Sequence, residues 1–129
     1  RERLPNNKNL REFNFGEWEL KKSSEIAAKY PKLSKDYWSS PGDTAPPNGE
    51  SWNQAAKRIN AEVDNINERY KGKNIIAVGH FGVILTQLQR AAKIQPQSAI
   101  SFQIDNLSIT HLEHLGDKNW RILSVNNIF

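Results

Sequence analysis

The amino-acid sequence predicts an α/β fold with three layers, in which helices cover both faces of a mostly parallel central sheet. A long amphipathic pattern at residues 52–70 is followed directly by a short apolar run at residues 74–80. A second helical pattern and a strand-like alternation come next, and helices that alternate with strands are typical of parallel sheets. The turn-like stretch "LGDKN" between two apolar segments adds a C-terminal antiparallel hairpin.

The first predicted helix covers residues 22–30, "KSSEIAAKY". Ile26 and Tyr30 have helical spacing there, and Pro31 is expected to end the helix, because proline cannot continue a helical hydrogen-bond ladder. Residues 39–49, "SSPGDTAPPNG", are dense in turn-forming residues. They predict a loop.

The longest predicted helix begins with a capping box formed by Ser51 and Gln54. In this motif each side chain satisfies a free backbone amide at the helix start. Gly72 is a suitable stop, because glycine often follows the last helical residue. The apolar stripe of this helix contains Trp52, Ala55, Ala56, Ile59, Val63, Ile66 and Tyr70.

The run "NIIAVGH", residues 74–80, is continuously apolar, as in strands buried on both faces of a parallel sheet. A second helix is predicted from about residue 82 to residue 93. Alternating apolar residues over 100–104 predict another strand, and residues 107–114 and 120–125 predict the two strands of the hairpin.

Composition places the chain among ordinary globular proteins of one domain. It has 129 residues, of which 37% are hydrophobic and 25% charged, and no segment has the length of a membrane span or a signal peptide. The net charge of +4 is spread along the chain, so a nucleic-acid partner is not favoured. The absence of cysteine fits a reducing compartment such as the cytoplasm. Because the chain starts with Arg1 and contains no methionine, we interpret it as a fragment, a processed chain or an incomplete sequence, and not as a whole gene product.

His80 lies where an α/β sheet usually binds ligands, at the carboxyl end of a strand and just before a helix. We expect free amides at Phe81, Gly82 and Val83, in the first helical turn, next to the positive end of the helix dipole. Gly82 lets a ligand approach the backbone closely. These features predict a seat for an anion such as phosphate, with the imidazole as a further donor. The alternative is a buried structural histidine that bonds to a carbonyl.

Several segments taken together resemble one known family. They are "LREFNFGEWE" (10–19), "PNGES" (47–51), "VGHFGVI" (78–84), "FQIDNLSIT" (102–110) and "WRILSVN" (120–126). Their order and spacing resemble the histidine phosphatase superfamily, which has the phosphoglycerate-mutase-like fold, and the short phosphatase branch in particular. A phosphoglycerate mutase is also compatible, but the connection between Glu50 and His80 is short for that branch. The resemblance extends over nearly the whole chain.

The resemblance implies a catalytic scheme. In that family one histidine attacks phosphorus to form a phosphohistidine, a second histidine and two arginines hold the phosphoryl oxygens, and a glutamate protonates the leaving group. His80 matches the second histidine and Glu12 the acid, with His80, Phe81 and Gly82 at the phosphate. Phe81 replaces the family's usual glycine. A general acid must carry a proton, and a neighbouring phosphate dianion favours the protonated form of a carboxyl group. We therefore expect Glu12 to lie against the phosphate. The alternative is a surface carboxylate.

The "R-H-G" triplet that carries the family's nucleophile is missing. His111 and His114 do not replace it, and their odd spacing on a strand places them on opposite faces, so no metal site or cofactor is expected. Two hypotheses follow. Either this is a phosphomonoesterase whose nucleophile lies upstream, so that residues 1–129 are the C-terminal portion of one domain and inactive alone, or it is a noncatalytic phosphate-binding or interaction module.

The resemblance implies a small phosphorylated metabolite or inorganic phosphate as the partner, with no nucleic acid and no membrane. "FGEWEL" and "PPNGE" resemble the α-ribazole phosphatases, and an unspecified metabolite is the alternative. The other polar residues of these motifs are expected to be structural or solvated. Glu17 and Glu19 are expected to be solvated or structural, Trp18 to lie in the core, and Arg58 to lie at the surface. Glu50 and Ser51 are expected to shape the loop and cap the helix, and the alternative for them is ligand binding.

Overall fold

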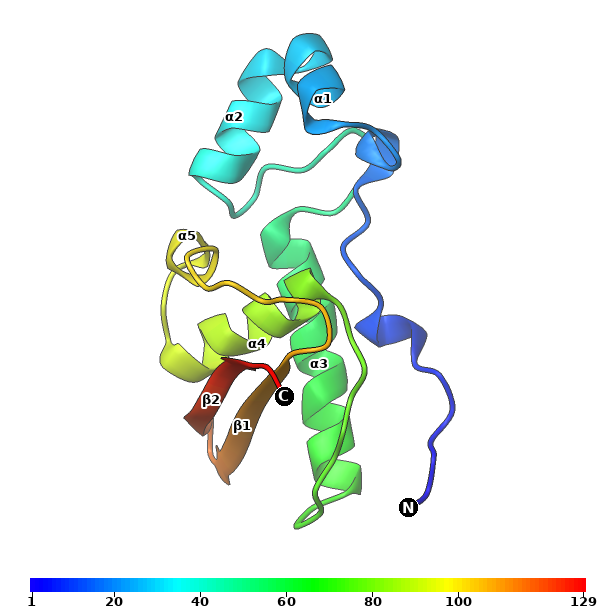
Figure 1. Ribbon diagram of the computed structural model, residues 1–129, viewed down its shortest axis with the longest axis vertical. Helices are drawn as coiled ribbons and strands as arrows, with labels where there is room; N and C mark the ends of the chain where they lie inside the picture. The colour runs from blue at the N-terminus through cyan, green and yellow to red at the C-terminus, as the bar shows by residue number, and fades with distance from the viewer.

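Five α-helices, two short 3-10 turns and one hairpin form the computed structural model, which describes residues 1–129. None of the helices combines the length and the hydropathy needed to cross a bilayer. Figure 1 shows α1 and α2 together at one end of an elongated molecule, and α3, α4 and the hairpin at the other. The elements in order are η1 (Lys8–Leu10), η2 (Gly16–Trp18), α1 (Ser23–Lys29), α2 (Pro31–Ser39), α3 (Trp52–Arg69), α4 (Phe81–Ala92), α5 (Pro96–Ala99), β1 (Ile109–Gly116) and β2 (Asn119–Asn127).

The packing of α3 against α4 forms the core. The predicted capping box starts α3: the Gln54 amide donates to Ser51 Oγ at 3.1 Å, and the Ser51 amide donates to Gln54 Oε1 at 2.8 Å. The buried residues of the apolar stripe of α3 share one core cluster with residues of α4. The buried side chains of the core are Phe13, Trp52, Ala55, Ala56, Ile59, Val83, Leu85, Leu88 and Ala99.

The predicted C-terminal hairpin is confirmed. Strands β1 and β2 pair antiparallel, and the turn between them contains Asp117 and Lys118, which have φ angles of 50° and 64°. Two successive residues with positive φ make a turn whose twist matches that of the flanking strands. Half-buried side chains of the hairpin, Leu112, Ile122 and Val125, pack against the core.

The predicted strands at residues 74–80 and 100–104 are not formed. Residues 74–80 run from the end of α3 to the start of α4 without strand pairing (Figure 1). Their side chains are open to solvent, with Ile76 79% and Val78 100% exposed. A strand needs hydrogen bonds from a neighbour, and no segment of residues 1–129 supplies them here. The only sheet is the two-stranded antiparallel hairpin, so these residues do not form the expected three layers around a parallel sheet.

The first helix ends before Pro31, as predicted, but a second helix that the sequence did not predict starts at this proline. Helix α1 ends at Lys29, and Pro31 then occupies the first position of α2. Proline suits that position because the first helical amide has no partner within the helix and the ring already holds the helical φ angle. The result is a pair of short helices joined at Tyr30. Trp18 is buried beside this pair, as predicted, with its ring centroid 5.3 Å from that of Tyr37.

Candidate active site

The Glu12 carboxylate lies against the amino end of α4. Glu12 Oε2 accepts the amide proton of Gly82 at 3.1 Å, and Oε1 accepts that of Phe13 at 3.0 Å. A Cβ atom at position 82 would lie 2.5 Å from Glu12 Oε1, so glycine is what permits this approach. A carboxylate is favourable there because the helix dipole places partial positive charge at its amino end. The contact joins two segments 70 residues apart.

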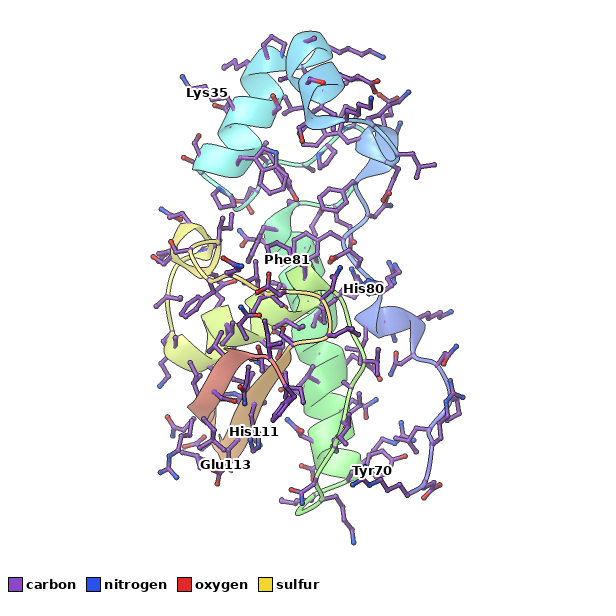
Figure 2. The ribbon with its side chains drawn as sticks, viewed as in Figure 1. Lys35, Tyr70, His80, Phe81, His111 and Glu113 are labelled. Carbon is purple, nitrogen blue, oxygen red and sulfur yellow. The ribbon has the colours of Figure 1, made fainter.

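His80 is the N-cap residue of α4 and is exposed, so it is not the buried structural histidine of the alternative interpretation. Its backbone is extended, with φ −116° and ψ 162°, and its side chain makes no hydrogen bond. Figure 2 shows His80 and Phe81 next to each other at the start of α4, and the Phe81 side chain is 47% exposed. Both side chains are therefore open to a ligand.

Two of the three expected donors at this helix start are free. The amides of Phe81 and Val83 make no hydrogen bond within the protein. The expectation was wrong for Gly82, whose amide is already occupied by Glu12. The helix end therefore offers two backbone donors beside a carboxylate that already holds the third.

Arg58 is not a surface residue, contrary to the expectation from the helical pattern. Its side chain is 14% exposed and pairs with Glu50, Nε donating to Oε2 and Nη2 to Oε1, both at 2.9 Å. The guanidinium also reaches backbone carbonyls of the segment that carries Glu12. One sequence signal could have indicated this burial: Arg58 lies beside the apolar stripe, three residues after Ala55 and four before Glu62. The Glu62 carboxylate contacts the N-terminal segment as well, through the side chains of Asn7 and Asn9.

Aromatic side chains enclose the site on the side of α2. The Tyr37 ring is 2% exposed and lies edge-on to Phe15, with ring centroids 6.4 Å apart. Burial, followed by the charges of Glu12 and Glu50, raises the pKa of Tyr37 to about 12. The phenol therefore stays neutral, and the two carboxylates are close enough to influence it electrostatically.

The other two histidines lie elsewhere. Both are exposed on β1, and Figure 2 shows His111 and Glu113 on the hairpin, well separated from His80. The His114 ring packs against Trp120 at a tilt of 48°, with centroids 4.7 Å apart. Nowhere in residues 1–129 do three or more histidine, aspartate or glutamate side chains gather closely enough to hold a metal ion.

The sequence profile of the histidine phosphatase superfamily (branch 1) matches residues 3–128. The chain belongs to this superfamily. A metal-independent phosphoserine phosphatase of Arabidopsis thaliana is 30% identical over 105 residues, which are 81% of this chain and 42% of that protein. A bifunctional protein of Mycobacterium tuberculosis is 28% identical over 84% of this chain and 29% of its own length. The chain thus spans less than half of the curated relatives it matches.

Solved structures share the fold. Bacillus stearothermophilus YhfR superposes with a TM-score of 0.86 and 23% identity over 95% of this chain and 61% of that one. The α-ribazole phosphatase of Shigella flexneri gives a TM-score of 0.77 and 20% identity over 94% and 59% of the two chains. A mycobacterial glucosyl-3-phosphoglycerate phosphatase, solved with inorganic phosphate, gives 0.73 and 24% over 93% and 63%. The superfamily member described here therefore has phosphatases among its structural neighbours.

Proposed function

We propose that the intact protein is a phosphomonoesterase that acts on a small phosphorylated metabolite through a phosphohistidine intermediate. Residues 1–129 are then the C-terminal portion of its single domain. The observation that supports this most is the contact of the Glu12 carboxylate with the Gly82 amide, 3.1 Å long. It brings a candidate acid to the helix end that also carries His80.

In this proposal the amino end of α4 is the phosphate seat. The free amides of Phe81 and Val83 and the exposed imidazole of His80 donate to phosphoryl oxygens, and Gly82 leaves room for the phosphate and for Glu12. Donors fixed before the reaction stabilise the charge of a phosphoryl group without reorganising. The dipole of α4 adds to this effect.

The nucleophile in this scheme is a histidine outside residues 1–129. Its ring nitrogen attacks phosphorus, the N–P bond forms as the ester P–O bond breaks, and Glu12 gives its proton to the leaving oxygen. Water then attacks phosphorus, transfers a proton to Glu12 and breaks the N–P bond, so that inorganic phosphate and the free histidine result. His111 and His114 lie on the hairpin, and neither is assigned this role.

The names of the relatives suggest which substrates to test. One relative is a phosphoserine phosphatase, and two structural neighbours are an α-ribazole phosphatase and a glucosyl-3-phosphoglycerate phosphatase. All three substrates are phosphate monoesters of aliphatic alcohols, whose leaving oxygen needs a proton. We favour none of these substrates over the others, although the motifs "FGEWEL" and "PPNGE" resemble those of the α-ribazole phosphatases.

The test uses the full-length protein and its Glu12→Gln variant, with Glu68→Gln, an exposed carboxylate at the end of α3, as the matched control. Loss of a general acid should lower turnover of phosphoserine by about 10² to 10⁴, and turnover of p-nitrophenyl phosphate much less, because its leaving group needs little protonation. Rapid acid-free quenching with labelled substrate should trap an acid-labile phosphoenzyme.

Equal losses on both substrates would show that Glu12 is not the acid. A full-length protein that binds inorganic phosphate but gives neither turnover nor phosphoenzyme would favour the noncatalytic phosphate-binding module instead.

A further inference from the structure

The segment that carries Glu12 has no regular secondary structure of its own. Residues 11–15 lie between the 3-10 turns η1 and η2. Within this segment the Glu12 carboxylate accepts only the adjacent Phe13 amide, at 3.0 Å. The position of the carboxylate over α4 therefore depends on what holds this segment from outside.

Arg58, on α3, holds the segment on its N-terminal side. Its Nη1 donates to the carbonyl of Asn9 at 2.8 Å and to that of Arg11 at 3.1 Å, and its Nη2 approaches the carbonyl of Glu12 at 3.4 Å. One guanidinium thus contacts three carbonyls within four residues. The fixed fork of an arginine can do this, whereas the single ammonium of a lysine cannot.

Glu50 holds the segment on its C-terminal side. Its Oε1 accepts the Asn14 amide at 2.8 Å, and its own amide donates to the Asn14 carbonyl at 2.7 Å. The same carboxylate accepts two hydrogen bonds from Arg58, each 2.9 Å long. Arg58 and Glu50 together therefore hold the backbone by hydrogen bonds on both sides of Glu12.

This ion pair is largely removed from solvent, because the side chains of Arg58 and Glu50 are 14% and 16% exposed. Burial alone would raise the pKa of Glu50, but the hydrogen bonds from Arg58 and the Asn14 amide hold it below its usual value. A bidentate contact between an arginine and a carboxylate stabilises the structure and also restricts the geometry of both side chains. An ion pair at the surface would contribute little to stability.

We propose that Arg58, acting through Glu50 and the backbone of residues 9–14, is a positioning residue that aims the Glu12 carboxylate at the leaving oxygen. The inference rests on the proposed phosphatase function. Arg58 does not touch the phosphate in this proposal; it sets the distance between the acid and the seat. A misplacement of about 1 Å at a catalytic group can cost about 10²-fold in rate.

The experiment compares Arg58→Lys and Glu50→Gln in the full-length protein with Arg90→Lys as the matched control. Arg90 is also a half-buried helical arginine with a carboxylate partner, Asp64 at 2.6 Å, but it contacts no residue of the Glu12 segment. The substrates are phosphoserine and p-nitrophenyl phosphate. We expect both test variants to lose about 10²-fold in kcat on phosphoserine and less than about 5-fold on the aryl ester, because only the alcohol needs the acid.

A double variant separates positioning from general damage. If Arg58 works through Glu12, adding Arg58→Lys to Glu12→Gln should cost almost nothing further on phosphoserine, because the acid is already gone. Urea unfolding of each single variant reports the loss of stability independently. Rescue is also expected to be graded, with Arg58→Lys more active than Arg58→Met.

Three results would overturn the proposal. They are additive losses in the double variant, equal losses on both substrates in Arg58→Lys, or unchanged turnover of phosphoserine. Each can occur while Glu12→Gln behaves as expected, so failure here differs from failure of the proposed function, in which Glu12→Gln itself shows no preference for the alcohol ester.

Discussion

Replacing Gly82 with alanine should push Glu12 off the amino end of α4. A Cβ at this position would lie 2.5 Å from Glu12 Oε1 and 3.0 Å from two ring carbons of Phe13. The glutamate can swing away at small cost, because its carboxylate is at the end of a flexible side chain. The Phe13 ring is 4% exposed and packs on Trp52 with ring centroids 5.3 Å apart, so it has little room to move.

The size of the effect follows from these two contacts. Inserting a methyl group into a well-packed site costs about 1–3 kcal/mol. The lost hydrogen bond to the carboxylate is worth about 1.5–3 kcal/mol if nothing replaces it. Because the displaced carboxylate regains water, we expect most of that second contribution to be recovered. The free energy of unfolding should therefore fall by about 2 kcal/mol in total.

Urea denaturation of the parent protein, Gly82→Ala and Gly42→Ala measures this difference. Gly42 is the control because the nearest atom to its added Cβ, Asn53 Nδ2, is 3.6 Å away, which is ordinary contact. Its change should stay within about 0.5 kcal/mol. If Gly82→Ala is as stable as Gly42→Ala, a side chain at position 82 does not collide with Glu12 and Phe13. The close approach of Glu12 to α4 would then not explain why residue 82 is glycine.

Two further predictions concern residues 50 and 51. Ser51→Ala removes the acceptor of the Gln54 amide at the start of α3 and should lower the free energy of unfolding by about 0.5–2 kcal/mol, with Ser51→Thr close to the parent in the same urea assay. The pKa of Glu50 is lower in the folded protein than in the unfolded chain, chiefly because Arg58 outweighs the opposing effect of burial. Its contribution to stability is therefore complete above the ordinary glutamate pKa and is lost as the pH falls through the folded value. Glu50→Gln should flatten the decline of stability with acid, and an unchanged decline would contradict the pairing.

The sequence was a good guide where a local rule decides the structure. The capping box of Ser51 and Gln54, the long helix after it and the hairpin around Asp117 follow from neighbouring residues alone. It failed at residues 74–80, where an apolar run predicts a strand, because a strand forms only with a partner and residues 1–129 provide none. It correctly ended α1 before Pro31 but missed α2, because proline is unfavourable inside a helix yet favourable at the first position of the next one.

In the candidate site, too, some contacts could be predicted from the sequence and others could not. The contact expected of Glu12 with the start of α4 is present, since it follows from a resemblance that already contains long-range information. The contacts of Arg58 were missed, because its partners at Asn9 and Arg11 lie 49 and 47 residues away in the chain. Hydrogen bonds to backbone carbonyls leave no trace in the identity of the residues that supply them. A helical projection shows which side of α3 Arg58 is on, but not what lies beside it.

The occupied Gly82 amide has a consequence for how the proposed acid would become protonated. Glu12 already lies where the helix dipole favours an anion, so an incoming phosphate at the free amides of Phe81 and Val83 would bring a second negative charge beside it. Two like charges this close favour the uptake of a proton by one of them. Substrate binding would then itself supply the proton that the proposed acid transfers. In that case phosphate binding should take up a proton at neutral pH in the parent protein but not in Glu12→Gln, a difference that calorimetry in buffers of different ionisation enthalpy can measure; equal uptake by both would exclude this coupling.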